Sequence, residues 1–284
     1  MFFKVGWSDV DQQLALMDES EIEKAVLLYP TSDAHLNLSG GWQELSTIYN
    51  EEIARVVQAH PDRFIGAGIL PIGSPEKYVD TIRDMKEAGL TVLSMASSYD
   101  GMYLDDESFH RVYDECARLG MPIHVHSQII SPIGEDRVKD PLLSPVLEYV
   151  FDVSISIGKL MMEGVFANYP NTNFIFAHFG GVLPLVRERF DTTYTMLRGR
   201  EFVKDLGARP SEFFKNLYFD TSGTKSHAAL ACALEMTDAD HLIFGSDFPA
   251  NKDFKSALSV ISESDLSETS KKMILSNPLL VNLA

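Results

Sequence analysis

Short apolar segments alternate with helix-like segments along nearly the whole chain, and this alternation constrains the fold more than any other feature. Seven apolar segments have the length and composition of strands that are buried on both faces, as in a parallel sheet. In chain order they are Lys24–Tyr29, Phe64–Leu70, Thr91–Met95, Pro122–His126, Asn173–Ala177, Leu217–Asp220 and His241–Gly245.

The segments between these strands have the apolar periodicity and the start and stop signals of helices. They are Ser8–Glu19, Glu44–Ala59, Pro75–Ala88, Ser108–Leu119, Pro145–Ala167, Leu183–Arg198, His227–Met236, Asp253–Ser262 and Ser267–Leu275. Repeated strand–helix units predict an α/β protein with a (β/α)8 TIM-barrel fold. The length of 284 residues suits one such barrel, so we expect residues 1–284 to form a single domain. The alternatives are a doubly wound sheet or two domains.

A barrel of this kind has eight strands, one more than the segments identified above. The only further candidate is Phe2–Val5, at the start of the chain. We therefore expect the first strand to be short or missing. Either this short segment is a stunted strand, or the first strand precedes Met1.

Composition excludes several classes of partner. The chain has 24 Lys and Arg against 41 Asp and Glu, a net charge of −17, which repels nucleic acid and anionic lipid surfaces. No apolar run reaches the ~18 residues of a membrane span, and the first residues do not resemble a signal peptide. The two cysteines show no metal-binding or redox spacing. We expect a cytoplasmic protein without nucleic-acid or membrane partners.

Polar side chains stand at the carboxyl ends of three predicted strands, where parallel barrels place their functional residues. His124 and His126 end one strand on the same face, His178 follows another and precedes two glycines, and Asp247 follows the last. Each has an ordinary structural interpretation as a hydrogen-bonded core residue, a tight turn or a helix cap. Together, two imidazoles and a carboxylate suit Zn²⁺ or Mn²⁺. Without a metal, a His and an Asp still form an acid–base pair.

Three fragments around these residues resemble the amidohydrolase-related family. They read GMPIHVHS, FIFAHFGGVLP and HLIFGSDFP, and PDRFIGAGILP, YLDDESFHRVYDECARLGMP and NPLLVNL support them. The family includes aminocarboxymuconate-semialdehyde decarboxylase, resorcylate decarboxylases and metal-dependent hydrolases. The resemblance extends from Asp18 to the end of the chain and implies a metal-dependent barrel enzyme.

The resemblance also implies roles for individual residues. His126 matches a metal ligand, His178 a catalytic histidine, and Asp247 a ligand that also accepts a proton. Arg189 matches an arginine that holds a substrate carboxylate; the alternative is a salt bridge on the helix surface. His124 has no role carried over from the family and is expected behind His126, beside the substrate. Tyr103 belongs to a loop that we expect to shape the pocket.

One family feature has no counterpart in this sequence. The first strand of the family supplies two metal ligands in a His-x-His or Glu-x-His pair, but Met1–Asp18 contains no histidine. The nearest, His35, follows the Lys24–Tyr29 strand and cannot replace that pair. Either an N-terminal segment is lacking, or the protein is a natural variant that works without a metal. We favour the first explanation because the later motifs are intact.

The sequence therefore predicts a metal-dependent hydrolase or decarboxylase acting on a small carboxylated or cyclic compound, with zinc or manganese as cofactor. The alternative is a metal-free or non-catalytic member that binds a small molecule. The family resemblance implies a homodimer, and the apolar segment Pro145–Ala167 could form its interface. Packing of that segment within the monomer is the other interpretation.

Overall fold

A single parallel sheet organises the protein. The computed structural model describes residues 9–223 and 225–283, and within them seven strands pair in the order β1-β2-β3-β6-β7-β8-β9. The strands are β1 (Ala25–Leu27), β2 (Phe64–Gly68), β3 (Leu90–Ala96), β6 (Ile123–His126), β7 (Phe174–Phe176), β8 (Tyr218–Asp220) and β9 (Leu242–Ile243). All seven strands predicted from the sequence are confirmed.

The burial of the strands explains why apolar runs identify them. All five residues of β2 are buried, and β6 and β7 are almost equally covered. Every neighbouring pair in this sheet is parallel. Parallel strands are joined by crossover connections, which place helices against the sheet. Both faces of such a sheet are buried, so its strands do not alternate between polar and apolar residues.

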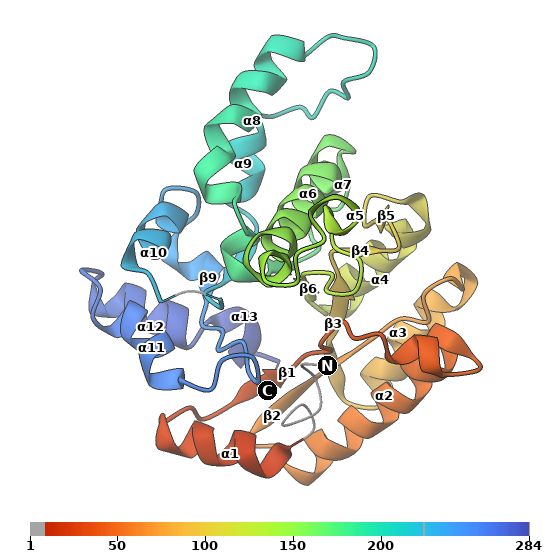
Figure 1. Ribbon diagram of the computed structural model, residues 1–284, viewed down its shortest axis with the longest axis vertical. Helices are drawn as coiled ribbons and strands as arrows, with labels where there is room; N and C mark the ends of the chain where they lie inside the picture. Colours follow the sequence, from red (N-terminus) through yellow and green to blue (C-terminus); the bar gives the residue numbers. More distant parts are fainter. Residues whose placement is uncertain (1–8, 224, 284) are drawn as a thin grey trace.

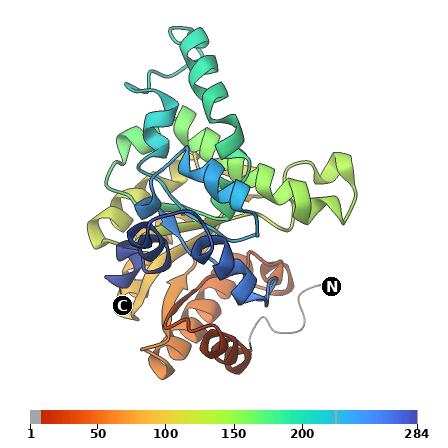
Figure 2. The same cartoon turned by 90° about the vertical axis from the view of Figure 1, so that its left-hand side faces the viewer.

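Helices connect the strands and also lie before the first and after the last of them. They are α1 (Val10–Glu19), α2 (Gly41–Ala59), α3 (Tyr78–Glu87), α4 (His110–Leu119), α5 (Glu135–Val138), α6 (Tyr149–Met162), α7 (Val165–Asn168), α8 (Leu183–Leu197), α9 (Pro210–Phe214), α10 (His227–Leu234), α11 (Phe254–Ser262), α12 (Glu268–Leu275) and α13 (Pro278–Val281). In Figure 1, α1 to α3 lie along one side of the strands and α10 to α12 along another. Helix α8 extends away from the sheet, as Figures 1 and 2 show. None of these helices is long and apolar enough to cross a membrane.

The sheet does not close into a full barrel within the described residues. Strands β1 and β9 are its two edges, and no described strand pairs with both of them. The candidate strand Phe2–Val5 lies outside the described residues. The described residues therefore form a curled α/β sheet of the TIM-barrel type that is open between β1 and β9.

Some helix boundaries differ from the sequence prediction. The segment Pro145–Ala167 was expected as one helix, but it begins as a π-helical turn, η4 (Ser144–Glu148), continues as α6 and breaks before α7. Gly164 adopts a left-handed conformation (φ 77°) at that break, which ends the α-helical path. Helix α9 and the hairpin of β4 (Ser98–Tyr99) and β5 (Met102–Tyr103) are not predicted from the sequence, because both are too short for a periodic signal.

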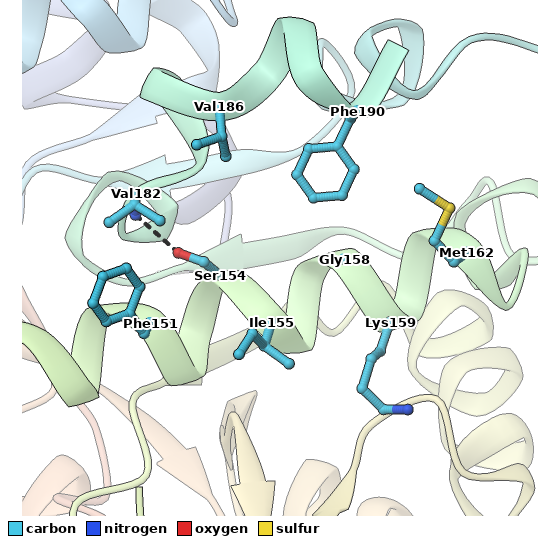
Figure 3. A pocket seen from close by; sticks show the side chains of 9 residues that line it. All are labelled: Phe151, Ser154, Ile155, Gly158, Lys159, Met162, Val182, Val186 and Phe190. Carbon is cyan, nitrogen blue, oxygen red and sulfur yellow. Dashed lines mark hydrogen bonds between the residues drawn. The ribbon is translucent and has the colours of Figure 1, made fainter. Parts of the chain in front are cut away.

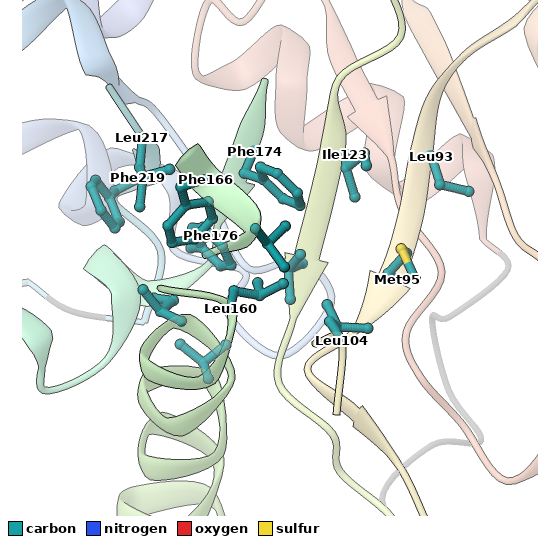
Figure 4. Close-up of a cluster of buried hydrophobic side chains, with 14 of the residues drawn as sticks. Leu93, Met95, Leu104, Ile123, Leu160, Phe166, Phe174, Phe176, Leu217 and Phe219 are labelled. Carbon is teal, nitrogen blue, oxygen red and sulfur yellow. The ribbon is translucent and has the colours of Figure 1, made fainter. Parts of the chain in front are cut away.

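Aromatic side chains from neighbouring strands and one helix fill part of the core (Figure 4). Phe174 and Phe176 of β7 are stacked with ring centroids 5.9 Å apart, and Phe166 of α7 contacts both edge-on. Phe219 of β8 continues the cluster next to Phe176. These four rings are at most 7% exposed. Burial of each such side chain stabilises the fold by roughly 1.5–3 kcal/mol.

A buried carboxylate joins α6 to the loops above the sheet. Asp152 of α6 is 1% exposed. It accepts hydrogen bonds from the hydroxyl of Ser97, that of Ser98 (3.0 Å), that of Tyr103 (3.0 Å) and the backbone N–H of Ile133 (3.1 Å). The end of β3, the β4–β5 hairpin and the loop after β6 therefore share one anchor.

We expect Asp152→Ala to lower the free energy of unfolding by about 3 kcal/mol, because several buried donors lose their acceptor. Urea unfolding followed by circular dichroism measures this. The exposed Asp114 of α4 is the matched control, and Asp114→Ala should change the free energy by less than about 0.5 kcal/mol. Equal effects of the two changes would contradict the anchor role of Asp152.

Candidate active site

Three side chains from separate parts of the sequence meet at the carboxyl edge of the sheet. His126 is the last residue of β6, His178 opens the short turn η5 (His178–Gly180) after β7, and Asp247 follows β9. One ring nitrogen of each histidine and one carboxylate oxygen lie within 4.8 Å of one another. The structure thus brings together the three residues that the sequence singled out.

The contacts of His126 define its orientation. Its Nδ1 lies 3.1 Å from the carbonyl oxygen of Ser127, and its Nε2 lies 3.9 Å from Oδ1 of Asp247. A carbonyl only accepts hydrogen bonds, so Nδ1 is the donor and Nε2 of the neutral ring is directed at the carboxylate. The ring of His178 stands edge-on to that of His126, with centroids 5.0 Å apart.

The two histidines have opposite electrostatic environments. Burial lowers the pKa of His126, but the Asp247 carboxylate and the Ser127 carbonyl outweigh it and raise the pKa above its ordinary value. For His178, burial is again the largest influence, and the charge of His126 adds to it, so its pKa is lowered. A pair of groups whose pKa values are driven apart is typical of acid–base sites.

The backbone around these residues adopts uncommon conformations. His178, Phe179 and Asp247 have positive φ angles of 57°, 56° and 60°. For Phe179 in particular, a left-handed conformation costs of order 1–3 kcal/mol, which the surrounding structure must offset. Gly180 and Gly181 also have positive φ. This tight turn directs the His178 ring back over the strand ends.

Two polar residues that are not among the sequence-predicted site residues lie beneath His178. Asp220 ends β8, and Ser222 follows it. The hydroxyl of Ser222 lies 2.8 Å from Nδ1 of His178, and Asp220 Oδ1 accepts the backbone N–H of His178 at 3.0 Å. Burial alone would raise the pKa of Asp220, but His124 and the other donors hold it well below its usual range. The rule that identified His126 could have found Asp220, since it also ends a predicted strand.

The other residues predicted for the site lie outside the cluster of His126, His178 and Asp247. His124 is 5% exposed, and its Nε2 lies 2.9 Å from Asp220 Oδ2, so it sits behind the cluster. The hydroxyl of Tyr103 is bound to Asp152. Arg189 is exposed on α8, and no ion pair joins it to the three converging residues within the described part of the chain. Contacts of these residues with a substrate stay predictions.

The donor set fits a divalent metal ion. Two imidazoles and a carboxylate are ligands that Zn²⁺ and Mn²⁺ accept. Among residues 9–223 and 225–283, no Lys or Arg forms an ion pair with Asp247, and its only charged partner is His126. The half-buried carboxylate, with 27% of its side chain exposed, is therefore not balanced by a Lys or Arg of the described residues.

Comparisons with known proteins agree on one family. Residues 40–277 match the family model described as Amidohydrolase. The chain is 28% identical over 212 residues to 2-amino-3-carboxymuconate-6-semialdehyde decarboxylase of Dictyostelium discoideum, covering 72% of this chain but 56% of that protein. It is 26% identical to gamma-resorcylate decarboxylase of Rhizobium sp. (strain MTP-10005), covering 84% of this chain and 76% of that protein.

Solved structures share the fold. The crystal structure of 2,6-dihydroxybenzoate decarboxylase from Rhizobium superposes with a TM-score of 0.83 at 23% identity, covering 96% of this chain and 87% of the other. That of 5-carboxyvanillate decarboxylase from Novosphingobium aromaticivorans DSM 12444, in complex with manganese and 4-hydroxy-3-methoxy-5-nitrobenzoic acid, gives 0.80 at 23% identity, covering 94% and 78%. The fold and family expected from the sequence are confirmed.

The turn after β7 depends on glycine. A Cβ at Gly181 would lie 2.1 Å from the carbonyl oxygen of Val150, and the residue has φ 70°. We expect Gly181→Ala to lower the free energy of unfolding by more than about 3 kcal/mol, measured by urea unfolding. Gly199 has φ 87° but open space around it. Gly199→Ala should cost only about 1 kcal/mol, and equal costs would argue against a clash at Gly181.

Proposed function

Because this chain belongs to the amidohydrolase family, we propose that it is a metal-dependent decarboxylase acting on a small aromatic carboxylate. The convergence of His126, His178 and Asp247 supports this most directly. The names of its relatives, decarboxylases of carboxymuconate semialdehyde and of gamma-resorcylate, support the reaction class. Hydrolysis of a lactone or amide by activated water is the second reaction that these groups could perform.

Two side chains, His126 through Nε2 and Asp247 through its carboxylate, would hold the cation. Zinc or manganese suits these donors, and manganese is present in the related 5-carboxyvanillate decarboxylase structure. When bound, the cation stabilises negative charge on the substrate. The carbonyl of Ser127 keeps the His126 ring in the orientation that directs Nε2 towards Asp247.

His178 would move the proton. Its lowered pKa keeps the ring largely neutral near pH 7, so it can accept a proton and return it. In decarboxylation of an aromatic carboxylate, His178 would first take up a proton from solvent and pass it to the ring carbon; the bond to the carboxylate then breaks, its electron pair restores the aromatic ring, and CO₂ leaves with His178 neutral again. The half-buried setting limits the access of water to this exchange.

A metal-free binding protein is the second candidate. Its support is that only His126 and Asp247 are assigned to the cation, fewer side chains than the three that a catalytic metal site usually has. Two donors hold a metal less firmly than a full set, and metal affinity is therefore the property that separates the two proposals.

We expect the purified protein to take up about one Mn²⁺ or Zn²⁺ per chain and His126→Ala to lower the affinity at least about 100-fold. Elemental analysis and isothermal titration calorimetry measure this. The exposed His227 is the matched control, since His227→Ala removes an imidazole away from the cluster. Less than about 0.2 metal per chain, with stability unchanged by a chelator, would favour the metal-free candidate.

We expect Asp247→Asn to lower kcat about 1,000-fold without unfolding the protein, because the carboxylate would hold the cation beside the substrate. CO₂ release from 2,6-dihydroxybenzoate, 5-carboxyvanillate and related acids measures activity, and a lactone panel tests hydrolysis. The exposed Asp238 is the matched control, and Asp238→Asn should keep full activity. A near-normal rate in Asp247→Asn would refute this site, and turnover of lactones alone would identify a hydrolase.

We further propose a homodimer built on the outer face of α6. A groove of about 380 Å³ lies between α6 and α8, and Figure 3 shows Phe151, Ile155 and Phe190 along it. None of the three converging donors lines this groove. A second apolar pocket shares Phe151 and Ile155 with this groove and extends the apolar surface to Leu147, which is 42% exposed. Contiguous apolar surface of this kind is typical of stable protein interfaces.

Light scattering after gel filtration tests the dimer. Phe151→Asp is expected to shift the protein to the monomer mass, because a charge would be buried in the interface. Leu36 is exposed (69%) in the turn after β1 and provides the control. Leu36→Asp should leave the mass unchanged, and a monomeric wild type would refute the proposal.

A further inference from the structure

A chain of hydrogen bonds connects three strand ends beneath the candidate active site. It runs from His124 Nε2 to Asp220 Oδ2 (2.9 Å), from Asp220 Oδ1 to the Ser222 hydroxyl, and from that hydroxyl to Nδ1 of His178 (2.8 Å). Asp220 is 7% exposed and Ser222 is 6% exposed. Water therefore has little access to these bonds, and the protons within them can be assigned by counting donors and acceptors.

Asp220 Oδ1 must be an acceptor. It receives the backbone N–H groups of His178 and Ser222, each at 3.0 Å, and both groups can only donate. A proton on that oxygen would be directed at other donors. The oxygen that contacts the Ser222 hydroxyl is therefore unprotonated, and this contact requires a hydrogen from serine.

The single hydroxyl proton of Ser222 is thus in the hydrogen bond to Asp220. If it were directed instead at His178, two oxygen lone pairs would face each other in the contact between Ser222 and Asp220. With the proton on the Asp220 side, the serine oxygen can only accept from the imidazole. Nδ1 of His178 is then the protonated ring nitrogen.

We infer that Ser222, oriented by Asp220, holds His178 in the tautomer with its proton on Nδ1, so that Nε2 offers a lone pair to the space shared with His126 and Asp247. Ser222 and Asp220 are positioning residues for the imidazole. The tautomer of His178 does not depend on the proposed function. Its consequence for catalysis rests on that function.

The same elements also fix where the ring stands. Asp220 holds the backbone N–H of His178, whose left-handed conformation turns the side chain towards Ser222. A Cβ at Gly223 would lie 2.8 Å from Nδ1 of His178, so glycine is needed for the backbone to approach the ring. Rotation of the ring by half a turn would place a C–H group against the serine oxygen and lose the hydrogen bond.

His126 reaches the same state by a different route. Its Nδ1 donates to the carbonyl of Ser127, so its Nε2 is also the unprotonated nitrogen of the neutral ring. Two imidazoles 5.0 Å apart thus present lone pairs to one space beside a carboxylate. Each tautomer is set by a neighbour on its far side, which is how proteins orient histidines that ligate metals or transfer protons.

Nitrogen-15 NMR of histidine-labelled, chelator-treated protein tests the tautomer without metal or substrate. The chain has eight histidines, and the signals of His178 are assigned from their loss in His178→Gln. We expect Nδ1–H to dominate in the wild type and the ratio of Nδ1–H to Nε2–H to fall about tenfold in Ser222→Ala, the effect of one lost hydrogen bond.

Ser156 provides a matched control, since its buried hydroxyl has no hydrogen-bond partner among the residues that the structure describes. Ser156→Ala should leave the His178 signals unchanged. Asp220→Asn is the second variant and should also lower the Nδ1–H fraction, because the amide no longer holds the serine hydroxyl in one orientation. An Nε2–H tautomer in the wild type, or an unchanged ratio in a folded Ser222→Ala, would overturn the inference.

Kinetics with an accepted substrate test the consequence. We expect Ser222→Ala to lower kcat about 100-fold while KM changes less than about threefold, because the proton transfer and not the binding is impaired. An unchanged kcat would refute the positioning role. If no substrate is turned over by the wild type while the NMR result holds, the proposed function fails and the tautomer assignment stands.

Discussion

The arrangement of the candidate active site depends on one buried carboxylate. Asp220 accepts hydrogen bonds from His124 on β6, from the backbone of His178 after β7 and from Ser222 after β8. Burial of an unpaired carboxylate would cost several kcal/mol, so this group is stable only because its donors surround it. The three strand ends are therefore held in one arrangement, and their side chains are oriented before any ligand binds.

The parallel sheet explains why chemistry gathers at this edge. All strand ends of one direction meet there, and the loops that follow can adopt conformations that a strand or helix cannot. The left-handed residues His178 and Asp247 use this freedom to turn their side chains over the strand ends. Strain of this kind persists where the surrounding contacts over-determine the backbone, as the Asp220 hydrogen bonds and the close packing of Gly181 do here.

The outer surface of α6 differs in chemical character from the candidate active site. The groove between α6 and α8 is apolar and contains none of the converging donors. Its character suits association and not acid–base chemistry, which needs polar groups in a half-buried setting. Asp152 lies on the inner side of α6 and fixes the loops after β3 and β6. One helix thus supports the active-site edge with one face and offers an apolar surface with the other.

The sequence by itself determined the seven strands, the α/β class, the family and the three donors His126, His178 and Asp247. It could do so because two-sided burial leaves continuous apolar runs, and because the ends of parallel strands meet at one edge. Only the tertiary structure decided that His178 is held by Ser222, 44 residues away, that His124 faces Asp220, and that Arg189 is exposed. It also decided where Pro145–Ala167 breaks. Periodicity reports which residues are buried, but the pairing of polar groups from distant segments depends on how the strands are placed side by side.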